Sequence, residues 1–171
     1  SGIGTSFPEI NPAIKVFTDP CNGETLLAIP AIDIDVAFLH AATSDIYGNV
    51  QYVGHAYGDR AIYAAADLTF VQVEKIVSNE EIRKDPLRTV IPGADGVIRA
   101  PFGSHPYASP GCYTEDKAHI REYVKAASVW TKDGDRGPLQ AYIERWVLEP
   151  NSHIEYLERV GLKVLLSLDE Y

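Results

Sequence analysis

The stretch of residues 40–54 constrains the fold most, because it joins a buried strand, which begins upstream at residue 35, to a polar turn and then to a second strand. Residues 36–39 read Val-Ala-Phe-Leu, a short apolar run of the kind that lies inside a sheet covered on both faces. The turn that follows contains Asp45, Gly48 and Asn49, which tolerate tight or left-handed backbone conformations. Residues 49–53 then alternate polar and apolar side chains, as a half-buried strand does.

Two interpretations of this turn remain open. Open α/β sheets bind ligands in loops at the carboxyl ends of their strands, so the turn is a candidate ligand loop. Turn chemistry alone also accounts for every residue of Asp-x-x-Gly-Asn, and in that case the segment only reverses the chain.

Segments on both sides of this stretch predict an α/β fold. Residues 25–29 form a strand that Pro30 ends, residues 59–66 form a short helix, and residues 68–73 form the next strand. A right-handed connection would make residues 36–39 parallel to this later strand. We therefore expect an open, mostly parallel sheet with flanking helices.

The carboxyl-terminal part of the chain is predicted to be helical. Apolar residues recur at helical spacing from Thr114 onward and again after Pro138. We expect residues 115–171 to be the helical end of a single α/β domain that spans residues 1–171, with residues 163–168 as a last strand.

The charge and composition of the chain limit its partners and location. A formal charge of −9 argues against general affinity for nucleic acid or anionic lipid, which needs Lys and Arg to neutralise phosphates. No apolar tract is long enough to span a membrane and no secretory leader is present, so we expect a cytoplasmic protein. The chain contains no Met and begins at Ser1, which suggests a processed product or the carboxyl-terminal part of a longer protein.

Three polar residues beyond the turn are candidates for a site. Residues 101–111 contain three prolines and two glycines, and loops of this kind are often functional. Ser104 and His105 are the polar groups of this loop, although local hydrogen bonding to the backbone accounts for His105 equally well. Glu74 directly follows the strand of residues 68–73 and is a candidate strand-end carboxylate, although a salt bridge or a helix cap would also explain it.

The remaining histidines and cysteines predict no metal site and no nucleophile. They lack the spacing of zinc ligands, and His119 and His153 are expected to face solvent. Cys21 and Cys112 are expected to be reduced thiols. No Gly-x-Ser-x-Gly elbow is present, and Ser1 as an amino-terminal nucleophile finds no supporting groups downstream.

Five short motifs occur in an order that resembles a known enzyme family. They are Thr25-Leu-Leu-Ala-Ile-Pro-Ala, Asp35-Val-Ala-Phe-Leu-His-Ala, Ser44-Asp-Ile-Tyr-Gly-Asn-Val-Gln, Val73-Glu-Lys-Ile-Val and Pro101-Phe-Gly-Ser-His-Pro. Each motif is weak alone, but five in register resemble the α subunit of family I coenzyme A transferases, of the glutaconate CoA-transferase type. The resemblance implies a fold of the ribose-phosphate-isomerase and CoA-transferase type. It also implies the carboxyl-terminal part of an α subunit, which is incomplete without an amino-terminal half.

The function that the resemblance implies is that of a coenzyme A transferase subunit. In this family a glutamate carboxylate attacks an acyl-CoA thioester, passes through an acyl anhydride to a glutamyl-CoA thioester, and hands the CoA to a carboxylic acid. The chain shows no match to that glutamate motif, so the glutamate is expected on a homologous β subunit. The implied partners are the missing amino-terminal half and this β subunit. A CoA thioester is the implied substrate, and no permanently bound cofactor is expected.

The resemblance gives no defined catalytic role to any residue of this chain. It implies that the turn and the proline-rich loop lie near the cleft or the subunit interface. The candidate substrate-loop or interface-loop residues are Asp45, Gly48, Asn49, Glu74, Ser104 and His105.

Other functions of the same broad fold remain open. An acyl-CoA hydrolase or ring-opening hydrolase subunit has the same architecture, and so does a non-catalytic structural subunit. A sugar-phosphate isomerase would need a glycine-rich phosphate-binding loop, which the sequence lacks.

Overall fold

The computed structural model describes residues 2–169, which fall into two compact units, one through Ile34 and one from Asp35 onward. In the first unit, helix α1 (Phe7–Ile10) precedes an antiparallel hairpin of β1 (Lys15–Thr18) and β2 (Thr25–Ala28). The strand predicted at residues 25–29 is therefore confirmed as β2.

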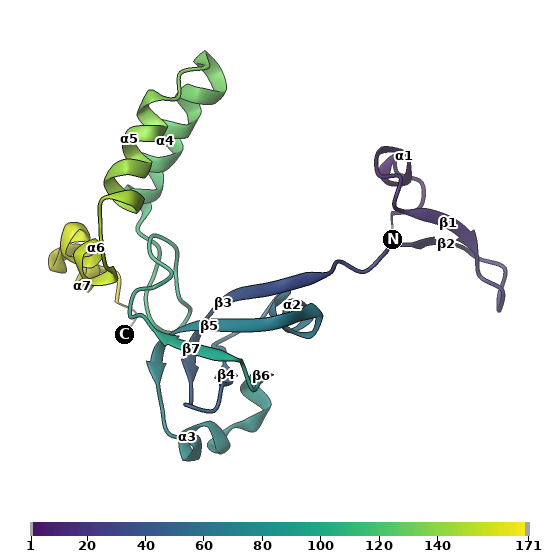
Figure 1. The fold of residues 1–171 in the computed structure, drawn as a ribbon, viewed down its shortest axis with the longest axis horizontal. Coiled ribbons are helices and arrows are strands. Elements are labelled where there is room, and N and C mark those ends of the chain that lie inside the picture. The colour runs from purple at the N-terminus through teal and green to yellow at the C-terminus, as the bar shows by residue number, and fades with distance from the viewer. Residues whose placement is uncertain (1, 170–171) are drawn as a thin grey trace. The chain divides into compact units, whose positions relative to one another are not determined.

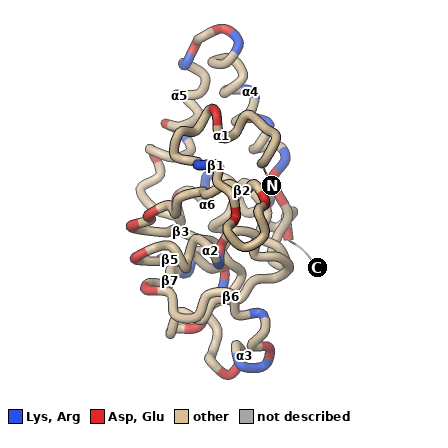
Figure 2. The backbone as a smooth tube through the Cα atoms, turned by 90° about the vertical axis from the view of Figure 1, so that its right-hand side faces the viewer, with Lys and Arg blue, Asp and Glu red and all other residues tan. Residues whose placement is uncertain are grey.

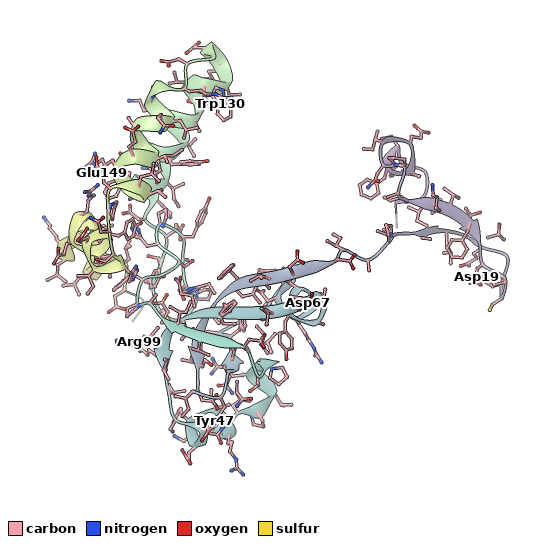
Figure 3. The ribbon with its side chains drawn as sticks, viewed as in Figure 1. Asp19, Tyr47, Asp67, Arg99, Trp130 and Glu149 are labelled. Carbon is pink, nitrogen blue, oxygen red and sulfur yellow. The ribbon has the colours of Figure 1, made fainter. Side chains whose placement is uncertain are left out.

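The second unit contains a five-stranded sheet in the order β6-β4-β3-β5-β7 (Figure 1). Its strands are β3 (Ile34–Ser44), β4 (Asn49–Gln51), β5 (Ala66–Ile76), β6 (Thr89–Pro92) and β7 (Gly96–Arg99). Strand β4 pairs antiparallel with β3 and β6, whereas β5 and β7 are parallel. Asp67 near the start of β5 and Arg99 at the end of β7 accordingly lie at opposite ends of this pair (Figure 3).

Strands β3 and β5 are also parallel, as expected from the sequence. Three contacts advance together along the two strands, joining Phe38 to Phe70, His40 to Glu74, and Ser44 to Val77. The predicted open α/β sheet with flanking helices is confirmed.

The two faces of the sheet differ in burial. One face packs on a core in which every member is at most 3% exposed: Ala41, Val50, Val71, Val73 and Ile91. The other face carries apolar side chains that stay exposed, namely Val36 (42%), Phe38 (75%), Leu68 (45%) and Ile98 (48%). Within the described residues, the expectation that the run 36–39 is covered on both faces is therefore wrong, because no described element packs over Phe38.

Helices connect the strands and form the end of the chain. The connecting helices are α2 (Asp59–Ala65), α3 (Asn79–Lys84) and the 3-10 turn η1 (Pro86–Arg88). The terminal ones are α4 (Lys117–Asp133), α5 (Gly137–Ile143), the π-helical η2 (Glu144–Leu148), α6 (His153–Val160) and α7 (Leu162–Ser167). Figure 1 shows α4 and α5 side by side. No helix among residues 2–169 is long and apolar enough to cross a membrane.

Local sequence signals explain one of these helices and mispredict another element. The Ser78 hydroxyl accepts a hydrogen bond from Glu81 N, so the predicted cap of α3 is confirmed. Acidic and basic residues then follow one another along α3 (Figure 2). Residues 163–168 were predicted as a strand, but residues 163–167 belong to α7 and Leu168 is its C-cap. Leu165 and Leu168 are buried three residues apart, a spacing that a short apolar run does not reveal.

The turn between β3 and β4 is organised by the Asp45 carboxylate, which is fully buried. Its Oδ1 accepts from Tyr47 N and Asn49 N at 2.9 Å each, and its Oδ2 accepts from the side-chain amides of Asn49 at 2.8 Å and Asn79 at 2.7 Å. Burial would raise the pKa of Asp45, but these hydrogen bonds outweigh it and hold the pKa below its ordinary value.

Gly48 locks this turn onto the segment between β6 and β7. Its carbonyl accepts from Gly93 N at 3.0 Å and Ala94 N at 2.9 Å, and its φ is +79°. A Cβ at this position would lie 2.4 Å from Ala94 O and 2.5 Å from Ala94 N, so no side chain fits without moving the backbone.

We expect Gly48→Ala to lower the free energy of unfolding by about 2 to 5 kcal/mol, since a left-handed alanine costs roughly 1 to 2 kcal/mol and forced overpacking about 1 to 3. Urea denaturation of the purified chain measures this loss. Gly54 is the matched control because it also has positive φ, +82°, but open space at its Cβ. Equal losses for Gly48→Ala and Gly54→Ala would contradict the close approach to Ala94.

Candidate functional site

A buried carboxylate lies at the centre of the candidate site. Glu74, near the end of β5, is 5% exposed. Its Oε1 accepts from the Tyr113 hydroxyl at 2.8 Å and lies 3.1 Å from His40 Nε2. Its Oε2 accepts from Phe102 N at 2.6 Å. Three separate segments of the chain therefore converge on one side chain.

The charge of Glu74 is stabilised by these contacts. Burial would raise its pKa, but hydrogen bonds with His40, Tyr113 and Phe102 N together hold the pKa below its ordinary value. Both oxygens of Glu74 are therefore engaged, and the carboxylate holds His40, Tyr113 and the Phe102 amide in place.

The proline-rich loop takes its shape from the same carboxylate. Phe102 has a φ of +57°, which is strained for a residue with a side chain, and its amide is the donor to Glu74. The Tyr113 hydroxyl donates to Glu74 and in turn accepts from Ser104 N at 2.8 Å. Ser104 is thereby held close to the end of β5, and its own hydroxyl donates to Ala108 O.

His40 connects this cluster to a cavity of about 250 Å³. Its Nε2 lies 3.1 Å from Ser109 Oγ as well as 3.1 Å from Glu74 Oε1. The cavity is lined by residues from β3, the segment after β4, the start of α2 and the proline-rich loop, among them His40, Tyr52, His55, Asp59, Ser104 and Ser109. These side chains could hold a small polar group of a ligand.

The six candidate residues predicted from the sequence do not form one site. Glu74 and Ser104 belong to the cluster beside the cavity, whereas Asp45, Gly48 and Asn49 hold the β3–β4 turn and do not line that cavity. All four hydrogen bonds to Asp45 come from the turn and from α3, so its role in the described chain is structural.

His105 belongs to a second buried cluster. Its Nε2 lies 3.3 Å from Asp116 Oδ2, and its Nδ1 lies 2.6 Å from the Tyr156 hydroxyl. His119 is 6% exposed, and its Nε2 lies 2.8 Å from the Tyr142 hydroxyl. The expectation that His119 faces solvent is wrong, because α5 and η2 pack aromatic rings against it. His153 stays exposed, although its ring contacts Pro101 O.

The ligand atoms of His105, Asp116 and His119 lie within 4.8 Å of one another and could hold a metal ion. Burial lowers the pKa of both histidines, so the neutral imidazoles needed for coordination predominate near neutral pH. Asp116 also caps α4, accepting from Ala118 N and His119 N, and each histidine has a tyrosine hydroxyl as a partner. Hydrogen bonding alone therefore accounts for the cluster.

Comparison with known proteins assigns the chain to a family. Residues 1–95 match the family model described as coenzyme A transferase. The chain belongs to the coenzyme A transferase family. It is 36% identical over 148 residues to one subunit of the glutaconate CoA-transferase of Acidaminococcus fermentans, a match that covers 85% of this chain and 44% of that protein.

Two further comparisons support the assignment of this chain to the coenzyme A transferase family. The cholesterol ring-cleaving hydrolase IpdA subunit of Mycobacterium tuberculosis is 34% identical over 139 residues, covering 75% of this chain and 48% of that protein. The crystal structure of glutaconate coenzyme A-transferase from A. fermentans matches with a TM-score of 0.84 and 33% identity, over 93% of this chain and 49% of that chain. The predicted CoA-transferase-like fold is confirmed, and the chain spans about half the length of these relatives.

Sequence reasoning missed several residues of these clusters, among them His40, Tyr113 and Asp116. His40 lies in one of the family motifs, but nothing in the sequence around a histidine at the end of a buried strand indicates that it contacts Glu74. Nothing local marks Tyr113 either. Asp116 could have been found as the Asp of Asp-x-x-His, which caps a helix and shares its first turn with His119.

Replacing Glu74 with Gln should lower the free energy of unfolding by about 2 to 3 kcal/mol near neutral pH, because hydrogen bonds to a charged group contribute roughly 1.5 to 3 kcal/mol. The folded-state pKa of Glu74 is depressed, so its stabilisation is complete above the unfolded pKa, about 4.3, and is lost as the pH falls through the folded value. The difference in the free energy of unfolding between the wild type and Glu74→Gln, measured by urea denaturation, should therefore become smaller in acid.

Glu81→Gln is the control, since the Glu81 side chain is 55% exposed and pairs with Lys84 at the surface. Such surface pairs contribute about 0 to 1 kcal/mol. If the difference in the free energy of unfolding between the wild type and Glu74→Gln stays constant from pH 7 to pH 3, Glu74 is not a charged, hydrogen-bonded group in the folded chain.

Proposed function

We propose that this chain is part of a coenzyme A transferase α subunit, which moves CoA between an acyl-CoA and a carboxylic acid. The observation that carries the proposal is the match to glutaconate coenzyme A-transferase over 93% of the chain at a TM-score of 0.84. The CoA thioester is the substrate, and no permanently bound cofactor takes part.

The covalent step belongs to a glutamate outside this chain. In the proposed reaction a glutamate oxygen attacks the thioester carbonyl and releases CoA thiolate, which leaves an acyl-glutamyl anhydride. The thiolate then attacks the glutamyl carbonyl and releases the acyl group as a carboxylate. Glu74 does not suit this role because three donors already engage its oxygens.

The proposed partners are a segment that corresponds to the unmatched half of the relatives, together with a homologous β subunit. The exposed apolar face of β3, β5 and β7 supports such partners, because contiguous apolar surface of this kind marks interaction sites. Phe38 and Phe70 stack on this face with ring centroids 5.6 Å apart, which gives it a rigid aromatic centre.

A hydrolase subunit is the second candidate. The 34% identity to the IpdA subunit of M. tuberculosis, named as a cholesterol ring-cleaving hydrolase, supports it. The two reactions differ in the acceptor, which is a carboxylate in one and water in the other.

The assembled protein, prepared with both proposed partners, should transfer CoA from an acyl-CoA to a free carboxylate. Exchange of labelled CoA into the acceptor thioester, followed by mass spectrometry, measures the reaction. Loss of thioester that requires no carboxylate acceptor would favour the hydrolase, and no reaction of either kind would contradict both candidates.

Phe38→Asp should weaken assembly with the partners by at least roughly tenfold in the dissociation constant, because it places a charge at the centre of the apolar face. Its effect on the stability of the chain alone should be about 0.5 to 1.5 kcal/mol, since Phe38 is 75% exposed and loses mainly its stacking contact with Phe70. Leu87→Asp is the matched control, with Leu87 at 95% exposure on η1. Analytical ultracentrifugation that finds equal affinity for both variants would refute the role of this face.

A further inference from the structure

The buried cluster of His105, Asp116 and His119 has the composition of a metal site. Each of the three residues is at most 8% exposed, and one ligand atom from each lies within 4.8 Å of the others. Two imidazoles and one carboxylate suit divalent transition ions such as zinc, whereas magnesium and calcium take oxygen ligands. None of the three residues lines the cavity beside Glu74.

The distances in the cluster suit a small ion. Around a tetrahedral zinc ion with bonds of about 2.0 to 2.2 Å, the ligand atoms lie roughly 3.3 to 3.6 Å apart. His105 Nε2 and Asp116 Oδ2 already have this separation, 3.3 Å. Asp116 is the N-cap of α4 and His119 lies in its first turn, so their side chains start from neighbouring positions. A small movement of the His119 ring then brings three ligands together.

Asp116 divides its two oxygens between two tasks. Its Oδ1 caps α4 by accepting from Ala118 N and His119 N at 3.0 Å each, whereas its Oδ2 faces His105. The positive amino-terminal end of a helix disfavours a cation, and the charge of Asp116 offsets this field. Oδ2 can therefore coordinate an ion without loss of the cap.

Two tyrosine hydroxyls hold the histidine rings, as the outer partners of metal ligands do. The Tyr156 hydroxyl lies 2.6 Å from His105 Nδ1, and the Tyr142 hydroxyl lies 2.8 Å from His119 Nε2. A hydroxyl both donates and accepts, so it keeps its hydrogen bond with either tautomer of the ring. When an ion replaces the hydrogen bond between His105 and Asp116, the ring proton can reside on Nδ1 and donate to Tyr156. The site therefore requires no particular tautomer of the ion-free cluster.

We propose that His105, Asp116 and His119 bind a divalent transition-metal ion of the zinc type, with water in the remaining coordination position. Hydrogen bonds satisfy the cluster without the ion, so the chain folds in both states and binding is reversible. The ligands join the proline-rich loop to the start of α4, and their tyrosine partners come from α5 and α6. The ion thus strengthens the connection between this loop and the terminal helices. It takes no part in the proposed CoA transfer.

Asp116→Asn tests the site, since asparagine is as good an N-cap as aspartate but carries no charge. Calorimetric titration of the chelator-treated full chain with zinc should show one ion per wild-type chain. We expect at least about tenfold lower affinity in Asp116→Asn, because changes even to the outer partners of metal ligands cost about 10- to 100-fold. Asp135→Asn is the matched control, since exposed Asp135 also accepts from a backbone amide, that of Gly137, but lies outside the cluster.

Cobalt(II) gives a second measurement that reports on coordination itself. The wild-type chain should produce visible cobalt absorption bands that zinc abolishes, and His119→Asn should lack them. His55→Asn is the control for loss of an imidazole, because His55 is exposed and lies outside the cluster. Circular dichroism without metal checks that each variant is folded, and Asp116→Asn decides the question if His119→Asn is not.

Three results would overturn the metal site. These are absence of zinc and cobalt(II) binding, equal zinc affinity of the wild type and Asp116→Asn, and a loss of cobalt bands in His55→Asn as large as in His119→Asn. The last result would show that surface histidines bind the ion. These measurements need neither CoA nor a partner subunit, so CoA exchange by an assembled protein that binds no zinc would refute the metal site and leave the transferase proposal intact.

Discussion

The buried carboxylate of Glu74 is the interaction on which the candidate site depends. A charge in this environment is tolerated only with hydrogen-bond donors around it, and three segments supply them. The proline-rich loop closes over the end of β5 because Phe102 N and Tyr113 both reach this carboxylate. His40 lies against the same charge and lines the neighbouring cavity.

Asp45 performs a comparable task at another point of the chain. Its four hydrogen bonds fix the β3–β4 turn and connect it to α3, while Gly48 joins the turn to the segment before β7. Both buried carboxylates therefore organise backbone and neighbouring side chains. Their engagement agrees with the proposal that the attacking carboxylate lies outside this chain.

Sequence patterns predicted the elements whose signals are local. The Ser78 cap, the turn at Asp45 and the strands β3 and β5 all follow from residues within a few positions of one another. The prediction from sequence failed where the packing of distant residues determines the secondary structure or the burial of a side chain. The run that forms α7 is too short to separate strand from helix by periodicity, and His119 is buried only because α5 and η2 cover it.

The sequence by itself determined the fold class, the turn chemistry and, through five motifs in register, the enzyme family. It also placed Glu74 at a strand end and Ser104 in a long loop. Only the tertiary structure decided that Glu74 meets His40 and Tyr113, that Ser104 lines a cavity and that His105 does not. The physical reason is that these contacts join residues far apart in the chain, so they exist only once parallel strand pairing has brought β3 and β5 together.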